Sequence, residues 1–306
     1  MTAVARQRRA AREGGLLWGG FTVPGSAWMI VFFLVPFYAV AAVAFGRIDP
    51  IFGTASPEWN PLQWDFTVAS NTLDEVFNGP LRTVYLRTFL YVGLALAMCV
   101  VIGYPVAYYV SRRAGRSKGL LLVLLILPFW VNYLLRMLAW IGLLQPEGWV
   151  NDALVALGIF DVPRSWLSGN PMVVVIGLAY GYLPFFILPL YASLDRLDQR
   201  LIEAARDLGA RPREVFRRVT LPLSMPGVVA ATVLTALPMF GDYYTNSLMS
   251  GSPKTEMIGN QIQFYVQNSK QPQKGAVLVL TLSLLLALLC LWYVLAAART
   301  RKLSRA

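Results

Sequence analysis

The chain has 306 residues, of which 57% are hydrophobic and only 14% are charged. A soluble fold of this length has no interior large enough to bury several uncharged runs of more than about twenty residues. The composition therefore excludes a soluble globular protein and predicts an integral membrane protein. The sequence contains no histidine, which excludes histidine-based metal sites and catalytic triads. The two cysteines, Cys99 and Cys290, lie in apolar runs and are interpreted as packing residues.

Six largely uncharged runs follow one another along the chain, and each is long enough to cross a bilayer core of roughly 30 Å as an α-helix. They predict an all-α fold with six transmembrane helices, at about 21–45, 88–110, 119–144, 171–194, 221–241 and 275–298. Residues 1–20 then form a basic N-terminal arm, and residues 299–306 form a basic tail. The first run exceeds the roughly 7 to 15 apolar residues of a secretory signal, so an uncleaved span is the better interpretation.

The distribution of basic residues predicts how the chain is oriented in the membrane. The net charge is +11, from 27 basic and 16 acidic residues. Nineteen of the 27 lie in the two terminal segments and in the loops that follow the second and fourth runs. Cytoplasmic loops of membrane proteins collect Lys and Arg, so both termini are predicted to be cytoplasmic. A basic excess on an apolar chain reports this topology, and no nucleic-acid partner is expected.

Two charged residues lie within or beside the apolar runs. Arg136 is 17 residues beyond Gly119, or about 26 Å along a helix, so snorkelling to the lipid headgroups is favoured over a role in a substrate path. Asp242 follows the fifth run, where a carboxylate is costly unless it faces water or a cation. Aromatic residues accompany it, and ring faces attract ammonium groups. Asp242, Tyr243, Trp130, Tyr182 and Phe185 are therefore candidate substrate-path residues. The alternative is an interfacial aromatic belt in which Asp242 caps or pairs locally.

The loop at residues 195–221 is too charged to lie in lipid. Leu197, Leu201, Ala204, Ala205 and Leu208 recur at three- and four-residue spacing, which predicts an amphipathic helix. Gly209 is placed to end this helix in a left-handed turn, and Pro212 is placed to open a second one. Such an element rests on lipid or docks onto a cytoplasmic protein, and composition alone favours lipid.

A motif in this loop resembles a known family. Glu203-Ala204-Ala205, then three residues, Gly209, nine residues and Val219-Thr220-Leu221-Pro222 resemble the EAA loop of permease subunits of binding-protein-dependent ABC importers, with Val219 where Ile is usual. Further segments, among them Gly103-Tyr104-Pro105 and Leu127-Pro128-Phe129-Trp130, are similar to spermidine/putrescine permeases of the PotB type. The resemblance implies a type I ABC importer transmembrane domain in a bacterial inner membrane.

The resemblance also implies partners and site residues. The EAA loop of that family is the coupling helix for the ATPase, so Glu203, Ala204, Ala205, Asp207 and Gly209 are candidate ATPase-coupling residues. The implied partners are two copies of a cytoplasmic ABC ATPase, a second homologous permease, an extracytoplasmic substrate-binding protein, a polyamine substrate and membrane lipid. No G-x-x-x-x-G-K-[ST] phosphate loop occurs, so ATP hydrolysis is expected on another polypeptide, and no cofactor, metal or catalytic residue is expected here.

Other functions stay open on the sequence. One is a permease of the same family for another small solute. Another is an ion-coupled secondary transporter, although such carriers usually need ionisable groups near the membrane midplane, and the middle of every run is uncharged. A membrane-embedded enzyme is the weakest alternative, because no catalytic constellation is recognisable.

Overall fold

The computed structural model describes residues 3–49, 55–267 and 271–303. The chain divides into two compact units, one formed by Met1–Leu73 with Tyr265–Thr281 and the other by Asp74–Phe264 with Leu282–Ala306. Within these described residues, five helices are long and apolar enough to cross a membrane, or six if one sharply bent pair counts as a span. The predicted multi-span helical protein is thus confirmed.

The first unit is built on helix α1, Ala3–Ala44. The described part of the basic N-terminal arm is helical and continuous with the first apolar run. A small antiparallel pair follows, with β1 (Arg47–Ile48) bonded to β2 (Ala55–Ser56). A 3₁₀ turn, η1 (Pro61–Gln63), and helix α2 (Thr67–Phe77) come next. The buried core of this unit consists of small side chains, which are those of Ala44, Ala69, Ala276 and Val277.

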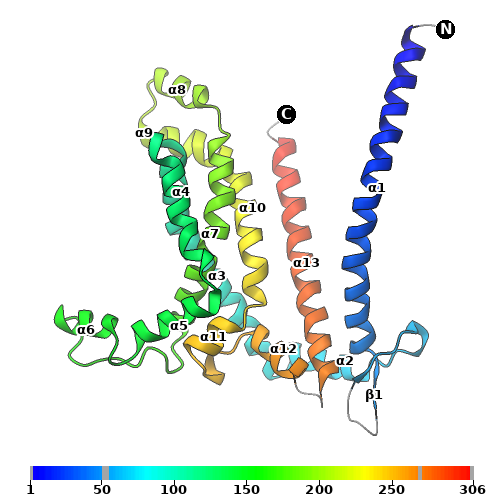
Figure 1. Cartoon of the computed structure of the whole chain (residues 1–306), viewed down its shortest axis with the longest axis vertical. Coiled ribbons are helices and arrows are strands. Elements are labelled where there is room, and N and C mark those ends of the chain that lie inside the picture. Colours follow the sequence, from blue (N-terminus) through cyan, green and yellow to red (C-terminus); the bar gives the residue numbers. More distant parts are fainter. Residues whose placement is uncertain (1–2, 50–54, 268–270, 304–306) are drawn as a thin grey trace. The chain divides into compact units, whose positions relative to one another are not determined.

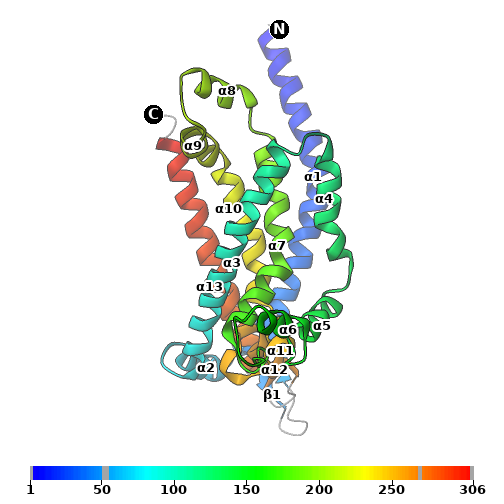
Figure 2. The same cartoon turned by 90° about the vertical axis from the view of Figure 1, so that its left-hand side faces the viewer.

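The second unit holds the remaining helices, which Figures 1 and 2 show from two sides. In chain order they are α3 (Pro80–Arg112), η2 (Gly115–Ser117), α4 (Lys118–Ile126), η3 (Leu127–Trp130), α5 (Tyr133–Leu144), α6 (Trp149–Ala156), α7 (Pro171–Asp195), α8 (Gln199–Asp207), α9 (Pro212–Val215), the π-helical turn η4 (Phe216–Thr220), α10 (Leu221–Phe240), α11 (Tyr244–Met249), η5 (Pro253–Thr255), α12 (Ile258–Gln267) and α13 (Pro272–Leu303). The last two helices contribute residues to both units.

Helix α7 is the centre of the second unit and packs against α3 and α10. It is the most enclosed of the long apolar helices, with 61% of its most apolar window buried. Fully buried Phe186, Leu190 and Leu194 follow each other at four-residue spacing and form its packed face. The hydroxyls of Tyr104 in α3 and Ser224 in α10 are 2.8 Å apart in the same interior. The packed helices α3, α7 and α10 therefore form the core of the second unit and connect its two ends.

The predicted span at residues 119–144 is sharply bent. The chain bends by 87° between the segments Gly115–Trp130 and Tyr133–Ala156. Pro128 lies in the short η3 turn and removes a helical hydrogen bond there. Asn132 then starts a new helix, because its side chain accepts a hydrogen bond of 2.8 Å from the backbone N–H of Leu134. Figure 1 shows α5 and α6 running away from the axis of α4.

The bend gives the second unit two distinct ends. Helices α8 and α9 lie at one end of α7 and α10, and α5, α6 and α11 lie at the other (Figures 1 and 2). Helix α6 follows α5 at the second of these ends. The two groups of candidate residues, the loop around Glu203 and the cluster around Asp242, therefore lie at opposite ends of the unit.

Candidate functional site

Asp242 lies two residues beyond the end of α10 and is only 6% exposed. Its Oδ1 accepts a 2.8 Å hydrogen bond from the backbone N–H of Thr245. Its Oδ2 accepts three more, from the hydroxyls of Tyr182 at 2.8 Å, Thr245 at 2.9 Å and Tyr133 at 3.1 Å. The carboxylate thus joins α5, α7 and α11 at one point, and every donor to it comes from the chain itself.

A glycine in α7 allows this convergence. A Cβ atom at Gly181 would lie 2.9 Å from Cε2 of the Tyr133 ring, closer than such atoms approach in folded proteins. The ring of Tyr133 therefore lies against bare backbone of α7. Tyr182, the next residue, extends its hydroxyl to the same carboxylate oxygen. The Gly181-Tyr182 pair is the local sequence that brings two tyrosine hydroxyls to Asp242.

A cavity of about 430 Å³ opens beside this carboxylate. Its volume falls in the range of small-molecule sites, roughly 300 to 1,000 Å³. Ring faces, hydroxyls, one amide and the carboxylate form its wall, contributed by Asn132, Tyr133, Leu134, Tyr182, Pro238, Gly241, Asp242, Tyr243 and Tyr244. The rings of Tyr243 and Tyr244 have centroids 4.0 Å apart. This combination offers an anionic group among aromatic faces.

The structure separates the predicted substrate-path residues into two groups. Asp242, Tyr243 and Tyr182 line the cavity together. Trp130 and Phe185 do not: these residues are 80% and 54% exposed, although the ring centroid of Phe185 lies 6.1 Å from that of Tyr182. These two residues stay predictions for another part of the path.

Two residues of the site were missed at the sequence level. Thr245 supplies two of the four donors to Asp242, and Asn132 lies on the cavity wall. The spacing Asp-x-x-Thr is a signal that could have found Thr245, since a side-chain oxygen commonly caps the N–H three residues later. No local signal exists for Asn132, which reaches the cavity only through the bend.

Arg136 packs onto an aromatic ring across the bend. Its Nε and Nη1 atoms are buried, and its guanidinium carbon lies 4.3 Å from the centroid of the Phe129 ring. The side chain therefore points back from α5 toward η3. Among the residues that the structure describes, no group of three His, Cys, Asp or Glu side chains could hold a metal ion.

At the opposite end, the loop 195–221 has the predicted helix, turn and helix. Asp198 caps α8, its carboxylate accepting a 2.9 Å hydrogen bond from the N–H of Arg200. Gly209 has a φ of +82°, the left-handed conformation that glycine adopts without strain. The N–H groups of Gly209 and Ala210 bond back to carbonyls of α8, at 2.8 and 3.1 Å. Pro212 then opens α9.

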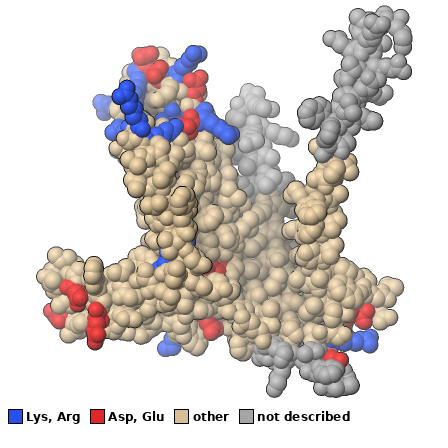
Figure 3. All heavy atoms as spheres, viewed as in Figure 1, with Lys and Arg blue, Asp and Glu red and all other residues tan. Residues whose placement is uncertain are grey.

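The surface of this loop is charged but carries exposed apolar side chains. Ile202 is buried and anchors α8, whereas Glu203, Ala204 and Asp207 are exposed. Leu208 is 89% exposed. Figure 3 shows both signs of charge gathered over α8 and α9, above a broad surface that is nearly uncharged. Exposed leucines among mixed charges are typical of a surface that meets another protein rather than lipid.

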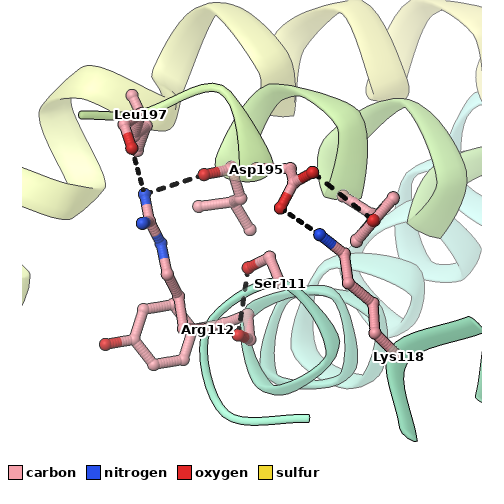
Figure 4. A network of polar contacts seen from close by, with 8 residues as sticks. Ser111, Arg112, Lys118, Asp195 and Leu197 are labelled. Carbon is pink, nitrogen blue, oxygen red and sulfur yellow. Dashed lines mark hydrogen bonds and ion pairs between the residues drawn. The ribbon is translucent and has the colours of Figure 1, made fainter. Parts of the chain in front are cut away.

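The base of the loop is fixed to α3 and α4 (Figure 4). One terminal nitrogen of Arg112 donates to the carbonyls of Leu194 and Leu197, at 2.8 and 3.0 Å. Leu194 lies in the last turn of α7, and Leu197 lies two residues beyond its end. Lys118 forms an ion pair of 2.5 Å with Asp195. These contacts tie the end of α7, where the loop begins, to α3 and α4.

Comparison with known proteins identifies the family. Residues 99–302 match the family described as "Binding-protein-dependent transport system inner membrane component". The chain belongs to this family. The matched segment runs from α3 into α13 and so includes both the loop around Glu203 and the cavity of Asp242. The protein is therefore a multi-pass membrane component of a transport system.

Curated relatives cover most of the chain. It is 37% identical over 267 residues to the spermidine/putrescine transport system permease protein PotB of Haemophilus influenzae, covering 87% of this chain and 89% of that protein. It is 40% identical over 200 residues to the PotB protein of Escherichia coli K12, covering 65% and 72%. The resemblance to PotB-type permeases is thus confirmed.

Solved structures share the fold. A chain of a bacterial alginate ABC transporter, in complex with an alginate pentasaccharide-bound periplasmic protein, matches with a TM-score of 0.68 at 15% identity, covering 93% of this chain and 94% of that one. A chain of the MetNI methionine ABC transporter matches with a TM-score of 0.50 at 21% identity, covering 71% and 96%. The predicted ABC transporter permease fold is confirmed by these likenesses, which concern architecture alone.

Proposed function

We propose that this protein is the transmembrane permease subunit of an ATP-driven importer of polyamines. The observation that carries the proposal is the aromatic cavity beside the buried carboxylate of Asp242. The names of the relatives, which are spermidine/putrescine permeases, support the same substrate class. An alkyl polyamine combines ammonium groups, which a carboxylate attracts, with methylene segments that pack on rings.

The cavity suits one ammonium group. Tyr133, Tyr182, Tyr243 and Tyr244 surround the space beside Asp242, and an ammonium over such a ring gains roughly 0.5 to 2 kcal/mol. Hydrogen bonds from three hydroxyls and one N–H hold the carboxylate in place before any ligand arrives. Because the carboxylate is already ordered, little conformational entropy is lost when the cation binds.

The loop 195–221 is the proposed coupling element. Glu203, Ala204 and Asp207 present an exposed face of α8, and the turn at Gly209 fixes the angle at which α8 meets the bundle. One copy of a cytoplasmic ATPase would dock there, and a second copy, a second homologous permease and an extracytoplasmic binding protein would complete the complex. ATP hydrolysis would occur on the ATPase, and both termini of this chain would be cytoplasmic.

The mechanism is alternating access. Closure of the ATPase pair would push α8, which follows α7 along the chain after only three residues. The contacts of Arg112 and Lys118 tie that end of α7 to α3 and α4, so these helices would move with it. Helix α7 carries Tyr182 at its other half, so a displacement of α7 changes the set of donors around Asp242. Substrate affinity at the far end thereby depends on the nucleotide state at the coupling end.

The same geometry favours a second candidate, a permease of this family for a different small solute. Asp242 already receives four hydrogen bonds and caps the start of α11. These hydrogen bonds satisfy the buried carboxylate, so Asp242 can also hold α5, α7 and α11 together without binding a cation. The two candidates differ in whether the negative charge, rather than the shape of the side chain, is needed.

Uptake of a radiolabelled polyamine by the full complex in proteoliposomes, with Asp242→Asn, separates the candidates. The change keeps the size of the side chain, and three of its four donors are hydroxyls that can rotate to accept from an amide. We expect the KM to rise at least several-fold while subunit assembly is unchanged. Asp161→Asn, at an exposed position, is the matched control. Uptake by the Asp242 variant with unchanged KM and maximal rate would overturn the polyamine assignment.

A further inference from the structure

Arg136 carries a positive charge that no acid in its surroundings offsets. Its Nε and Nη1 atoms are buried without a hydrogen-bond partner, and no carboxylate of the described residues lies within ion-pair distance. The guanidinium carbon lies instead 4.3 Å from the ring centroid of Phe129, 5.4 Å from that of Tyr133 and 6.0 Å from that of Tyr180. Ring faces hold the cation, and they leave its charge uncompensated.

Tyr133 links this cation to the cavity. Its ring faces Arg136, and its hydroxyl donates to Oδ2 of Asp242 at 3.1 Å. These two contacts limit the separation between the guanidinium and the carboxylate to roughly 11 Å, a range over which partly buried charges still interact. Tyr133 and Asp242 line the cavity, whereas Arg136 does not. Arg136 therefore acts on the cavity through its electric field and not by contact.

We propose that Arg136 is a specificity-determining residue that limits the cavity to a single ammonium group of its substrate. The proposal rests on the proposed function and deepens it. A first ammonium is attracted by Asp242. A second one in the same cavity meets the field of Arg136 with no further acid to offset it. A polyamine therefore binds by one end, and its other charges lie outside this cavity.

A purely structural role for Arg136 predicts a different experimental result. Phe129 precedes the bend and Arg136 follows it, so their contact also ties η3 to α5. A variant that lost only this tie would transport every amine less well, by the same factor. The charge of the substrate would then not matter, and a comparison of amines within one variant distinguishes the two roles.

The test measures KM for linear amines with one, two and three ammonium groups, using the full complex. Arg136→Gln and Arg136→Met remove the charge, and Arg136→Lys keeps it. We expect the two neutral variants to lower the KM for the diamine relative to that for the monoamine by roughly tenfold, the effect of unit charges about 10 Å apart at an effective dielectric near 20. Arg136→Lys should keep the wild-type ratio. A ratio of KM values does not depend on how much of a variant is folded.

Arg164→Gln is the matched control, because the guanidinium of Arg164 lies 4.2 Å from the ring centroid of Phe160 at an exposed position. Its KM ratio should equal that of the wild type. An unchanged ratio in both neutral Arg136 variants, or an equal loss for all three amines, would overturn the role of Arg136 while wild-type uptake upholds the proposed function. If the wild type takes up none of the amines, the proposed function and this inference both fail.

Discussion

The hydroxyl of Tyr133 in α5 donates a hydrogen bond of 3.1 Å to Asp242 beyond the end of α10, across 109 positions of sequence. This contact exists because the third apolar run bends by 87° and turns α5 back toward the end of α10. A straight third span would carry Tyr133 onward along the axis of α4. The cavity therefore depends on the bend, which brings Tyr133 to Asp242.

The tyrosine hydroxyls should affect the KM for uptake by holding the carboxylate of Asp242 in place. Tyr182→Phe removes the 2.8 Å donor to the carboxylate, and a net loss of about 0.5 to 1.5 kcal/mol corresponds to a KM roughly 2- to 10-fold higher. On the Asp242→Asn background the same change should have little further effect, because the partner is already altered. Uptake kinetics of the two single variants and the double variant measure this coupling. Tyr109→Phe, an exposed tyrosine of α3, is the control, and additive effects in the cycle would contradict the prediction.

Gly181→Ala should displace the ring of Tyr133. The new Cβ would lie 2.9 Å from that ring, so the ring must shift and its hydroxyl must move from Asp242. We expect a KM several-fold higher with the protein still assembled, measured by uptake and by co-purification of the complex. Gly142→Ala is matched to it, since no atom lies within 4 Å of a Cβ at that helical position. Alanine there should leave uptake unchanged and add helix stability of about 0.5 to 1 kcal/mol. Equal kinetics in both variants would disprove the role of the close contact.

The sequence predicted those features that local patterns determine. Apolar runs indicated the long helices, and the Gly209-to-Pro212 segment indicated the turn and the second helix of the coupling loop. The angle of the bend before Asn132 could not be predicted, because an apolar run records length and polarity but not direction. The full cavity was missed for a related reason. Its wall combines residues of α5, α7 and α11, and their meeting depends on the bend and on the space above Gly181.

Arg112 should contribute more to stability than Lys118. Arg112→Met removes two charge-assisted hydrogen bonds, to the carbonyl of Leu194 in the last turn of α7 and to that of Leu197 just beyond it, which costs about 1 to 3 kcal/mol. Lys118→Met breaks an ion pair whose side chains are 32% and 37% exposed, and solvent screening limits that cost to below about 1 kcal/mol. Thermal unfolding of the detergent-solubilised protein compares the two. A larger fall in Tm for the Lys118 variant would contradict this order.

The proposed orientation places α8 in the cytoplasm and α6 outside. Single cysteines at exposed Ser117 and Gln199 should react with a membrane-impermeant maleimide only from the cytoplasmic side, and those at exposed Ala153 and Ser168 only from the other. The background should lack the native Cys99 and Cys290, so that all labelling reports the introduced cysteine. Labelling of intact cells and of inverted vesicles reports the two sides. Any exchange between the two pairs would refute the topology.

Gly209→Val should uncouple the permease from its ATPase. A β-branched residue at a φ of +82° is strained by about 1 to 3 kcal/mol, and relief of that strain changes the angle at which α8 leaves the bundle. Gly158 offers a matched control, because its φ is +69° and no atom lies within 4 Å of a Cβ there, as at Gly209. Both variants therefore carry similar strain, but at opposite ends of the second unit. We expect Gly209→Val to lose ATPase co-purification and ATP-dependent uptake while it remains inserted in the membrane, and Gly158→Val to keep the ATPase. If both variants retain the ATPase and transport at wild-type rates, the loop at 195–221 is not the coupling element.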